Sequence, residues 1–200
     1  MLIALRRFLK IMKWIAFFSQ TGSEIMNVIE NTGREPDLIV TNRTDLNGVN
    51  LKLLNKYKSK IRQLPNRPTV NDYYNLINKN RNLFDNCVIT LHGYLRIIPD
   101  FMCENYRIYN LHPGLITKYP ILKGFNPQEK AFRLKLPTSG AVIHKVTPVL
   151  DSGKILKSIE VDIKNLSLDE IYDKIHKSSS QLWTDFLNEL EGFNLIDEKE

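Results

Sequence analysis

Short apolar runs alternate with helical periodicity along the first half of the chain. Where apolar residues recur every three or four positions, the pattern predicts helices at 24–30, 70–82 and 99–105, with a short helix near 51–57 inside a polar stretch from 42 to 68. Runs bounded by polar turn residues predict strands at 14–19, 37–41, 87–91 and 106–111. This alternation favours an α/β fold with a single doubly wound, mostly parallel sheet, whose ligands bind beyond the carboxyl ends of the strands.

The second half of the chain changes character. Residues 139–146 and 155–163 alternate as strands do, and the turn sequence Asp151-Ser152-Gly153 lies in the connection between them, so a C-terminal strand pair is expected. A long helix is predicted over 168–190, because Ser167 and Glu170 have the spacing of a capping box. We therefore expect one domain over 12–192, an N-terminal extension over 1–11 and an acidic tail over 193–200, whose last residues 196–200 fray.

Composition places the chain among single compact domains. With 200 residues and 42% hydrophobic residues, it is long enough to bury a core without covalent staples. Cys87 and Cys103 are too few for a disulfide framework and lack metal-ligand spacing, so both are predicted to be buried thiols in a reducing, cytoplasmic compartment. The four histidines are not paired at metal-ligand spacing either, so no metal is expected.

The charge pattern speaks against membrane and nucleic-acid partners. The net charge is +6, and it would be +3 without the leader residues Arg6, Arg7 and Lys10. The apolar stretch 2–18 could form an amphipathic surface helix or a poor membrane segment, but positive charges interrupt it and no signal-peptide cleavage site follows. A basic patch over 52–62 is read as a solvated face rather than a nucleic-acid site.

The candidate chemistry begins where the strand 106–111 ends. Asn110 and His112 are two residues apart, and side chains at that spacing on an extended strand point the same way. Asp151 follows a strand that also carries His144. An amide, an imidazole and a carboxylate can together bind an oxyanion, move a proton and hold an imidazolium, although each segment alone is also a common turn sequence.

These segments resemble the signature of the folate-dependent formyltransferases. The residues that carry the likeness are Asn110-x-His112-Pro113, then Ser139-Gly140-x-x-x-His144, then Asp151-Ser152-Gly153, in that order. Residues 91–98 are similar to the family segment that holds the pterin, which implies cofactor contacts at Leu95, Arg96, Ile97 and Ile98. The resemblance also implies a cofactor contact at His144. Residues 19–23 resemble the loop that holds the acceptor phosphate, which implies contacts at Thr21, Gly22, Ser23 and Glu24. The likeness covers about residues 12 to 190 and implies a Rossmann-like formyltransferase fold.

The resemblance also implies a reaction. A primary amine would attack the formyl group of 10-formyltetrahydrofolate, and Asn110 and protonated His112 would stabilise the oxyanion. Asp151 would keep His112 charged or in place and pass the amine proton to the leaving folate nitrogen, with no metal required. The implied acceptor is a small-molecule amine on a nucleotide, most nearly glycinamide ribonucleotide of purine biosynthesis, and the enzyme would be a monomer or homodimer.

Departures from the family pattern fall on the acceptor side. Glu24 stands where the family has Asn, and its carboxylate would repel a phosphate at the helix terminus unless it turns away. Ser179-Ser180 before Trp183 replaces a Glu-His pair, and Lys123-Gly124-x-x-Pro127 resembles methionyl-tRNA and sugar formyltransferases as much as the purine enzyme. We expect neither the C-terminal domain of the methionyl-tRNA enzymes after Leu190 nor the N-terminal regulatory domain of the formyltetrahydrofolate hydrolases within residues 1–13. The alternatives are therefore an N-formyltransferase for an amino-sugar nucleotide and a non-catalytic folate- or nucleotide-binding module.

The three remaining histidines receive different interpretations. His144 is expected to support the catalytic groups from behind, and His176 to lie on the surface of the long helix. For His92 two readings stay open, a place in the wall of the folate pocket and a structural role in which hydrogen bonds satisfy the ring.

Overall fold

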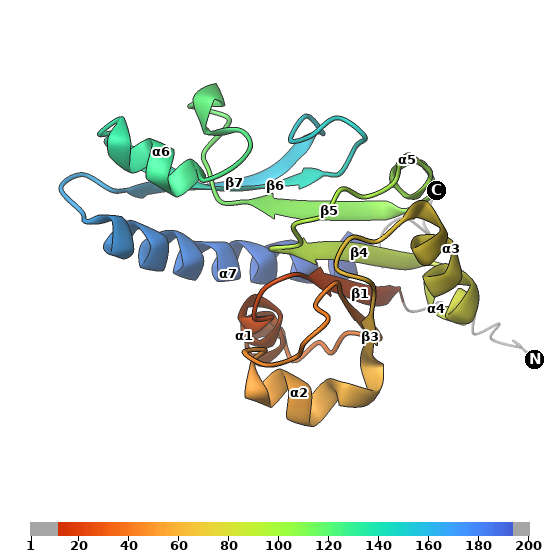
Figure 1. Ribbon diagram of the computed structural model, residues 1–200. Coiled ribbons are helices and arrows are strands. Elements are labelled where there is room, and N and C mark those ends of the chain that lie inside the picture. Colours follow the sequence, from red (N-terminus) through yellow and green to blue (C-terminus); the bar gives the residue numbers. More distant parts are fainter. Residues whose placement is uncertain (1–11, 194–200) are drawn as a thin grey trace, which may run out of the picture.

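A computed structural model describes residues 12–193, which form one seven-stranded sheet with helices on both faces (Figure 1). The strand order is β3-β2-β1-β4-β5-β6-β7. The first five strands in the chain run parallel, and β6 and β7 continue the sheet in antiparallel fashion. The strands are β1 (Lys13–Phe18), β2 (Leu38–Thr41), β3 (Ile61–Gln63), β4 (Cys87–His92), β5 (Arg107–His112), β6 (Thr138–Lys145) and β7 (Ile155–Asp162). The predicted doubly wound, mostly parallel sheet with a C-terminal strand pair is confirmed.

The helices cover both faces of this sheet. The helices α1 and α7 pack on one face, and α3 and α5 pack on the other. The helix α6 lies against the first turns of α7, where Tyr172 Oη donates to Glu129 Oε1 at 3.5 Å. No helix within residues 12–193 is long and apolar enough to cross a membrane. The helices are α1 (Ser23–Thr32), α2 (Leu51–Tyr57), η1 (Lys58–Lys60), α3 (Val70–Lys79), α4 (Arg81–Phe84), α5 (Asp100–Asn105), η2 (Pro120–Leu122), α6 (Pro127–Arg133) and α7 (Leu168–Phe193).

Both faces of the central strands are buried, which explains their continuous apolar runs. In β1, Ala16 and Phe18 pack with α1 and α7, whereas Ile15 and Phe17 pack on the face covered by α3 and α5. Cys87 and Cys103 both lie in this second core, as predicted, and burial raises the pKa of the Cys87 thiol to about 12. The thiols are therefore packing residues rather than nucleophiles.

The capping signal of the last helix is confirmed atom by atom. Ser167 N–H donates to Glu170 Oε2 at 2.7 Å, and Glu170 N–H donates to Ser167 Oγ at 3.4 Å. This reciprocal pair satisfies two backbone donors at the start of α7. The helix continues past the predicted residue 190 to Phe193. The expectations for residues 1–11 and 196–200 lie outside the described residues.

Several element boundaries differ from the predictions, each for a local reason. The predicted helix 70–82 breaks at Asn80, whose Nδ2 donates to the Leu76 carbonyl and ends α3. Pro99 is the N-cap of α5 rather than its first helical residue. The sequence reading missed β3, which has three residues at the edge of the sheet, and also η2 and α6, which follow irregular backbone such as Asn126 at φ 52°. Such short or irregular elements carry too few residues for a periodic signal.

Candidate active site

Asn110 and His112 lie at the carboxyl end of β5, next to the first antiparallel strand. Residue pairing places Asn110 opposite His144 of β6 and opposite Leu91 of β4. Leu91 belongs to the core under α3 and α5, so Asn110 and His112 lie on that face of the sheet. The spacing of two residues thus puts both side chains at one place, as the sequence reading expected.

Asp151 reaches this place from the connection between β6 and β7. Its carboxylate is buried, with Oδ2 3.4 Å from His112 Nδ1 and Oδ1 3.5 Å from His144 Nε2. The backbone at Asp151 has φ 48°, a conformation that costs a residue other than glycine about 1 kcal/mol or more. The connection is held tightly, because Ser152 Oγ donates to the Val149 carbonyl at 2.7 Å. A strained residue held in this way is typical of a functional position.

His144 connects the amide to the carboxylate. Its Nδ1 faces the Lys145 carbonyl at 3.0 Å, and a carbonyl only accepts, so Nδ1 carries the proton. Nε2 then accepts a hydrogen bond from Asn110 Nδ2 at 3.2 Å. Burial, the main cause, lowers the pKa of His144, while the Lys145 carbonyl and Asp151 act in the opposite direction. A neutral His144 therefore fixes the Asn110 amide and leaves its second N–H for another acceptor.

His112 is enclosed by acceptors on both sides. Its Nε2 donates to the Leu122 carbonyl at 2.8 Å, and its Nδ1 faces Asp151. A ring with a proton on each nitrogen would donate to the Leu122 carbonyl and form an ion pair with Asp151. Gly114 packs against the same ring, since a Cβ at this position would lie 3.0 Å from His112 Nε2. The geometry suits an imidazolium that donates to an oxyanion.

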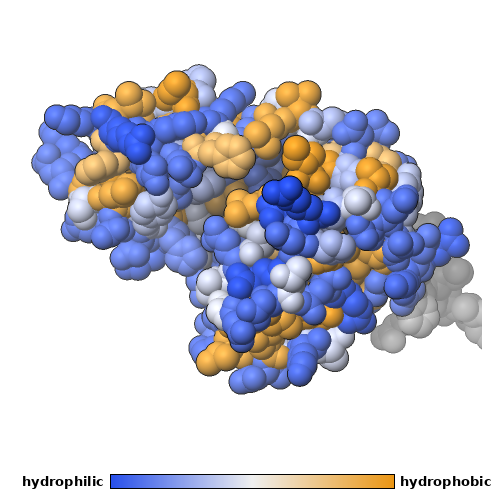
Figure 2. Space-filling model, in the orientation of Figure 1, coloured by the Kyte–Doolittle hydropathy of each residue, from blue (hydrophilic) through white to orange (hydrophobic). Residues whose placement is uncertain are grey.

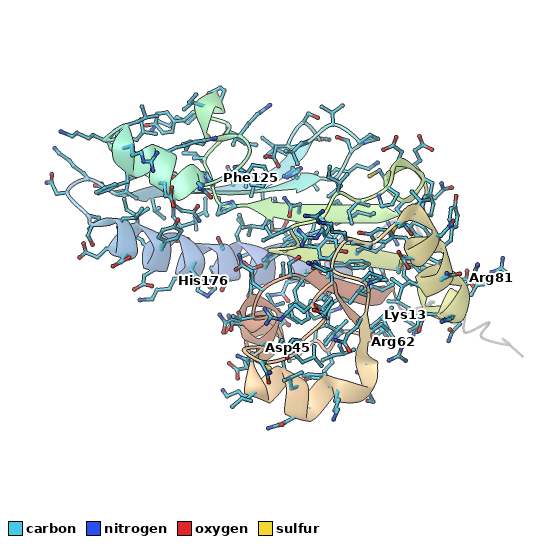
Figure 3. The ribbon with its side chains drawn as sticks, in the orientation of Figure 1. Lys13, Asp45, Arg62, Arg81, Phe125 and His176 are labelled. Atoms are coloured by element: carbon cyan, nitrogen blue, oxygen red, sulfur yellow. The ribbon has the colours of Figure 1, made fainter. Side chains whose placement is uncertain are left out.

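The segment around η2 closes over the two charged groups. Its Leu122 carbonyl binds His112, and its Gly124 N–H donates to Asp151 Oδ2 at 2.9 Å. The next residue, Phe125, is 81% exposed and lies beside the antiparallel part of the sheet in Figure 3. The segment therefore orients His112 and Asp151 with backbone groups, and access to His112 Nε2 requires that the Leu122 carbonyl move away.

The predicted folate segment divides into two kinds of residue. Leu95 is 55% exposed and Ile97 is 82% exposed, so both offer apolar surface to a ligand. The side chain of Ile98 is buried in the core under α3 and α5. The Arg96 guanidinium donates to the Asn66 carbonyl and to Asn66 Oδ1. His144 lies with Asn110 and Asp151 instead.

The predicted phosphate loop opens α1. Gly22 is the N-cap with φ 72°, and a Cβ there would come within 2.6 Å of Leu53. Thr21 Oγ1 binds both the hydroxyl and the backbone N–H of Ser23. The Glu24 carboxylate is turned toward His92 and Trp183, two partners that the sequence reading missed. The sequence held a signal for the position of His92, because Thr90 and His92 are two residues apart at the end of a strand, as Asn110 and His112 are.

The surface of the molecule is indented between two groups of helices. The outline is re-entrant between the part built by α6 and α7 and the part built by α1 and α2, and the arrows of β4 and β5 point toward it (Figures 1 and 2). A hollow of about 250 Å³ at the ends of β1 and β2 is lined by polar residues that include Ser19, Asn42 and Arg96. A larger hollow of about 440 Å³ contains Arg81 and none of the candidate site residues. Arg81 lies at the far end of the sheet from Phe125 (Figure 3). Within residues 12–193 no group of three acidic, histidine or cysteine side chains could hold a metal ion.

Comparison with known proteins identifies the family. The chain is 33% identical over 116 residues to phosphoribosylglycinamide formyltransferase of Bacillus subtilis (strain 168), which covers 56% of this chain and 57% of that one. It is 27% identical over 165 residues to the human trifunctional purine biosynthetic protein adenosine-3, 73% of this chain and 15% of that protein. The chain thus spans little more than half the length of the first relative and less of the second.

Solved structures show the same fold. The crystal structure of phosphoribosylglycinamide formyltransferase from Campylobacter jejuni subsp. jejuni NCTC 11168 superposes with a TM-score of 0.77 at 23% identity, over 90% of this chain and 97% of that chain. A sequence model of the formyl transferase family matches residues 12–187, which is most of the described chain and includes Asn110, His112 and Asp151. The chain therefore belongs to the formyl transferase family.

Proposed function

We propose that this protein transfers a formyl group from 10-formyltetrahydrofolate to the primary amine of glycinamide ribonucleotide. The observation that carries the proposal is the contact of Asp151 with both His112 and His144, beside Asn110, at the carboxyl edge of the sheet. Membership of the formyl transferase family supports the reaction class. The name of the Bacillus subtilis relative supports the acceptor.

The proposed reaction forms one bond and breaks another. The acceptor amine attacks the formyl carbon, and the carbonyl oxygen becomes an oxyanion that accepts from the free N–H of Asn110 and from His112 Nε2 once Leu122 has moved. Asp151 takes the amine proton and returns a proton to the folate nitrogen, directly or through water. The bond from the formyl carbon to that nitrogen then breaks, and tetrahydrofolate and the formylated amine leave. No oxidant or reductant is needed.

The folate would lie against the exposed apolar side chains of Leu95 and Ile97. As further parts of the proposal, the substrates are small molecules, neither a nucleic acid nor a membrane is a partner, and the enzyme works in the cytoplasm as a monomer or homodimer. The catalytic unit is the domain 12–192. No metal takes part in the proposed steps.

One observation favours a second acceptor class, an amine on a sugar nucleotide. Glu24 lies in the first turn of α1, where a phosphate would otherwise be attracted by free backbone N–H groups. A carboxylate at this position disfavours a second negative charge. A sugar nucleotide can place its amine at the formyl group while its phosphates lie elsewhere.

The deciding experiment measures tetrahydrofolate release from 10-formyltetrahydrofolate with glycinamide ribonucleotide, with an amino-sugar nucleotide and without acceptor. We expect release that depends on glycinamide ribonucleotide and a stoichiometric formylated product. Turnover with the amino-sugar nucleotide alone would move the assignment to the second class. Formate release without any acceptor would indicate a hydrolase, and no turnover would indicate a non-catalytic binding module.

A further inference from the structure

A second polar cluster lies on the opposite face of the same sheet edge. Its hydrogen bonds run from Trp14 Nε1 to Thr90 Oγ1 at 2.7 Å, from Thr90 Oγ1 to His92 Nε2 at 2.8 Å, and from His92 Nδ1 to Glu24 Oε2 at 2.9 Å. Trp183 Nε1 adds a bond to Glu24 Oε2 at 3.1 Å. Side-chain hydrogen bonds thus connect four elements, β1, β4, α1 and α7, and two of these bonds end on the Glu24 carboxylate.

Groups that can only donate or only accept fix the direction of the bonds at the two ends of this chain. An indole N–H only donates, so Thr90 Oγ1 accepts from Trp14 Nε1. Between Thr90 Oγ1 and His92 Nε2 either group can be the donor, because a hydroxyl oxygen has a second lone pair. His92 Nδ1 carries the proton that Glu24 accepts. The chain of bonds therefore ends on the Glu24 carboxylate, whose Oε2 accepts from two donors.

The other oxygen of Glu24 remains available. No hydrogen bond joins Glu24 Oε1 to another of the residues from 12 to 193. The Glu24 side chain is 16% exposed and the His92 side chain 0% exposed, so the carboxylate is fixed at the rim rather than free in water. A negative charge in the first turn of α1 already stabilises the helix without these buried partners. The contacts of Oε2 satisfy the buried N–H groups of His92 and Trp183, and they hold Oε1 in a fixed position.

The cluster is within reach of the reacting groups. Leu91 pairs with Asn110 across β4 and β5, so His92 lies one residue further along the neighbouring strand, and paired strands are about 4.8 Å apart. Trp183 belongs to the core under α1 and α7, whereas Asn110 lies on the other face. A molecule that crosses this edge can place one end at Asn110 and another at Glu24.

We propose that Glu24 Oε1 binds the hydroxyl groups of the acceptor's sugar ring and so sets acceptor specificity, with His92 and Trp183 as positioning residues. This inference rests on the proposed function, because the amine at the other end must meet the formyl group beside Asn110. Oε1 has only lone pairs to offer, so it binds hydrogen-bond donors such as sugar hydroxyl groups and disfavours an anion. A hydrogen bond to a charged group contributes about 1.5 to 3 kcal/mol, which is about a 10- to 150-fold change in affinity.

The test compares binding of glycinamide ribonucleotide and its 2′-deoxy and 3′-deoxy analogues by calorimetry, without folate. We expect the wild type to bind the parent compound at least about 10-fold more tightly than one deoxy analogue, and Glu24→Ala to bind all three alike. Glu24→Gln keeps the shape of the side chain and should show an intermediate ratio. The matched control is Glu30→Ala, which removes from the same helix an exposed carboxylate that pairs with Lys52, and this variant should keep the wild-type ratio.

The outcomes separate this inference from the proposed function. An unchanged ratio in both Glu24 variants, no discrimination by the wild type, or no binding of the parent compound would each overturn it. Formyl transfer to glycinamide ribonucleotide without any influence of Glu24 would leave the proposed function standing alone. Binding that discriminates through Glu24 without any formyl transfer would leave the specificity site standing and remove the reaction.

Discussion

At the scale of single residues, the carboxylate of Asp151 contacts three other groups of the candidate site. It lies 3.4 Å from His112 Nδ1 and 3.5 Å from His144 Nε2 and accepts from the Gly124 N–H, so its charge acts on His112 and on the backbone of the η2 segment. Asp151→Asn keeps the shape and removes the charge, and we expect kcat to fall by about 100-fold or more while the fold is kept. Steady-state kinetics test this, with the exposed Asp169→Asn as a control that should retain normal turnover. Near-normal turnover of Asp151→Asn would remove its role in proton transfer.

The buried His144 ties stability to pH. Its pKa lies below the ordinary value of 6.5, mainly because of burial, so near and below pH 6.5 the unfolded chain binds a proton that the native protein does not. This part of the stability is therefore lost as the pH falls through 6.5. We expect urea unfolding at pH 7.5 and at pH 5.5 to differ less in His144→Gln than in the wild type. Equal pH dependence in both proteins would contradict a neutral native His144.

At the scale of elements, the connection between β6 and β7 places Asp151. Gly153 packs so closely that a Cβ would collide with the Lys145 carbonyl. Gly153→Ala must therefore push the connection away from β6 and carry Asp151 with it. We expect a loss of about 1 to 3 kcal/mol of unfolding free energy, together with a lower kcat.

A substitution at Gly33 tests the cost of an alanine at a left-handed position without any movement of Asp151. Gly33 ends α1 with φ 71°, and a Cβ there would meet nothing within 4 Å. Gly33→Ala should lower the unfolding free energy by about 1 kcal/mol and leave kcat unchanged. Chemical denaturation and kinetics on both variants make the comparison. If kcat fell equally in both, displacement of Asp151 could not be the cause.

At the scale of the whole molecule, the folded unit is proposed to begin at Met12. Met12 is buried, its carbonyl accepts from Arg34 at 3.0 Å, and the family match starts at the same residue. A chain that begins at Met12 should keep its kcat and melt within about 2 °C of the full chain, because a loss of 1 kcal/mol would shift the midpoint by about 2 to 4 °C. A chain that begins at Ile15 loses the fully buried Trp14 and should be destabilised by about 3 to 5 kcal/mol or fail to fold. Thermal unfolding of both chains tests the boundary.

The sequence by itself determined the features that depend on neighbours in the chain. The apolar runs of β1 and β4, the capping box of Ser167 and Glu170, and the shared direction of Asn110 and His112 all follow from periodicity or short spacing. The order of the family segments also predicted that Asp151 lies at the site with Asn110 and His112. These features are local, because backbone geometry alone turns such spacings into faces and caps.

Only the tertiary structure decided contacts between distant segments. Glu24 meets His92 across 68 residues and Trp183 across 159, and nothing in the local pattern at Glu24 indicates which way its carboxylate turns. The same holds for the Leu122 carbonyl at His112 and for the burial of Ile98. Strand register, helix packing and the path of irregular backbone set these contacts, and they depend on the whole chain at once. The reaction could therefore be predicted from the sequence, whereas the carboxylate proposed to read the acceptor emerged only from the packing of α1 and α7 on the sheet.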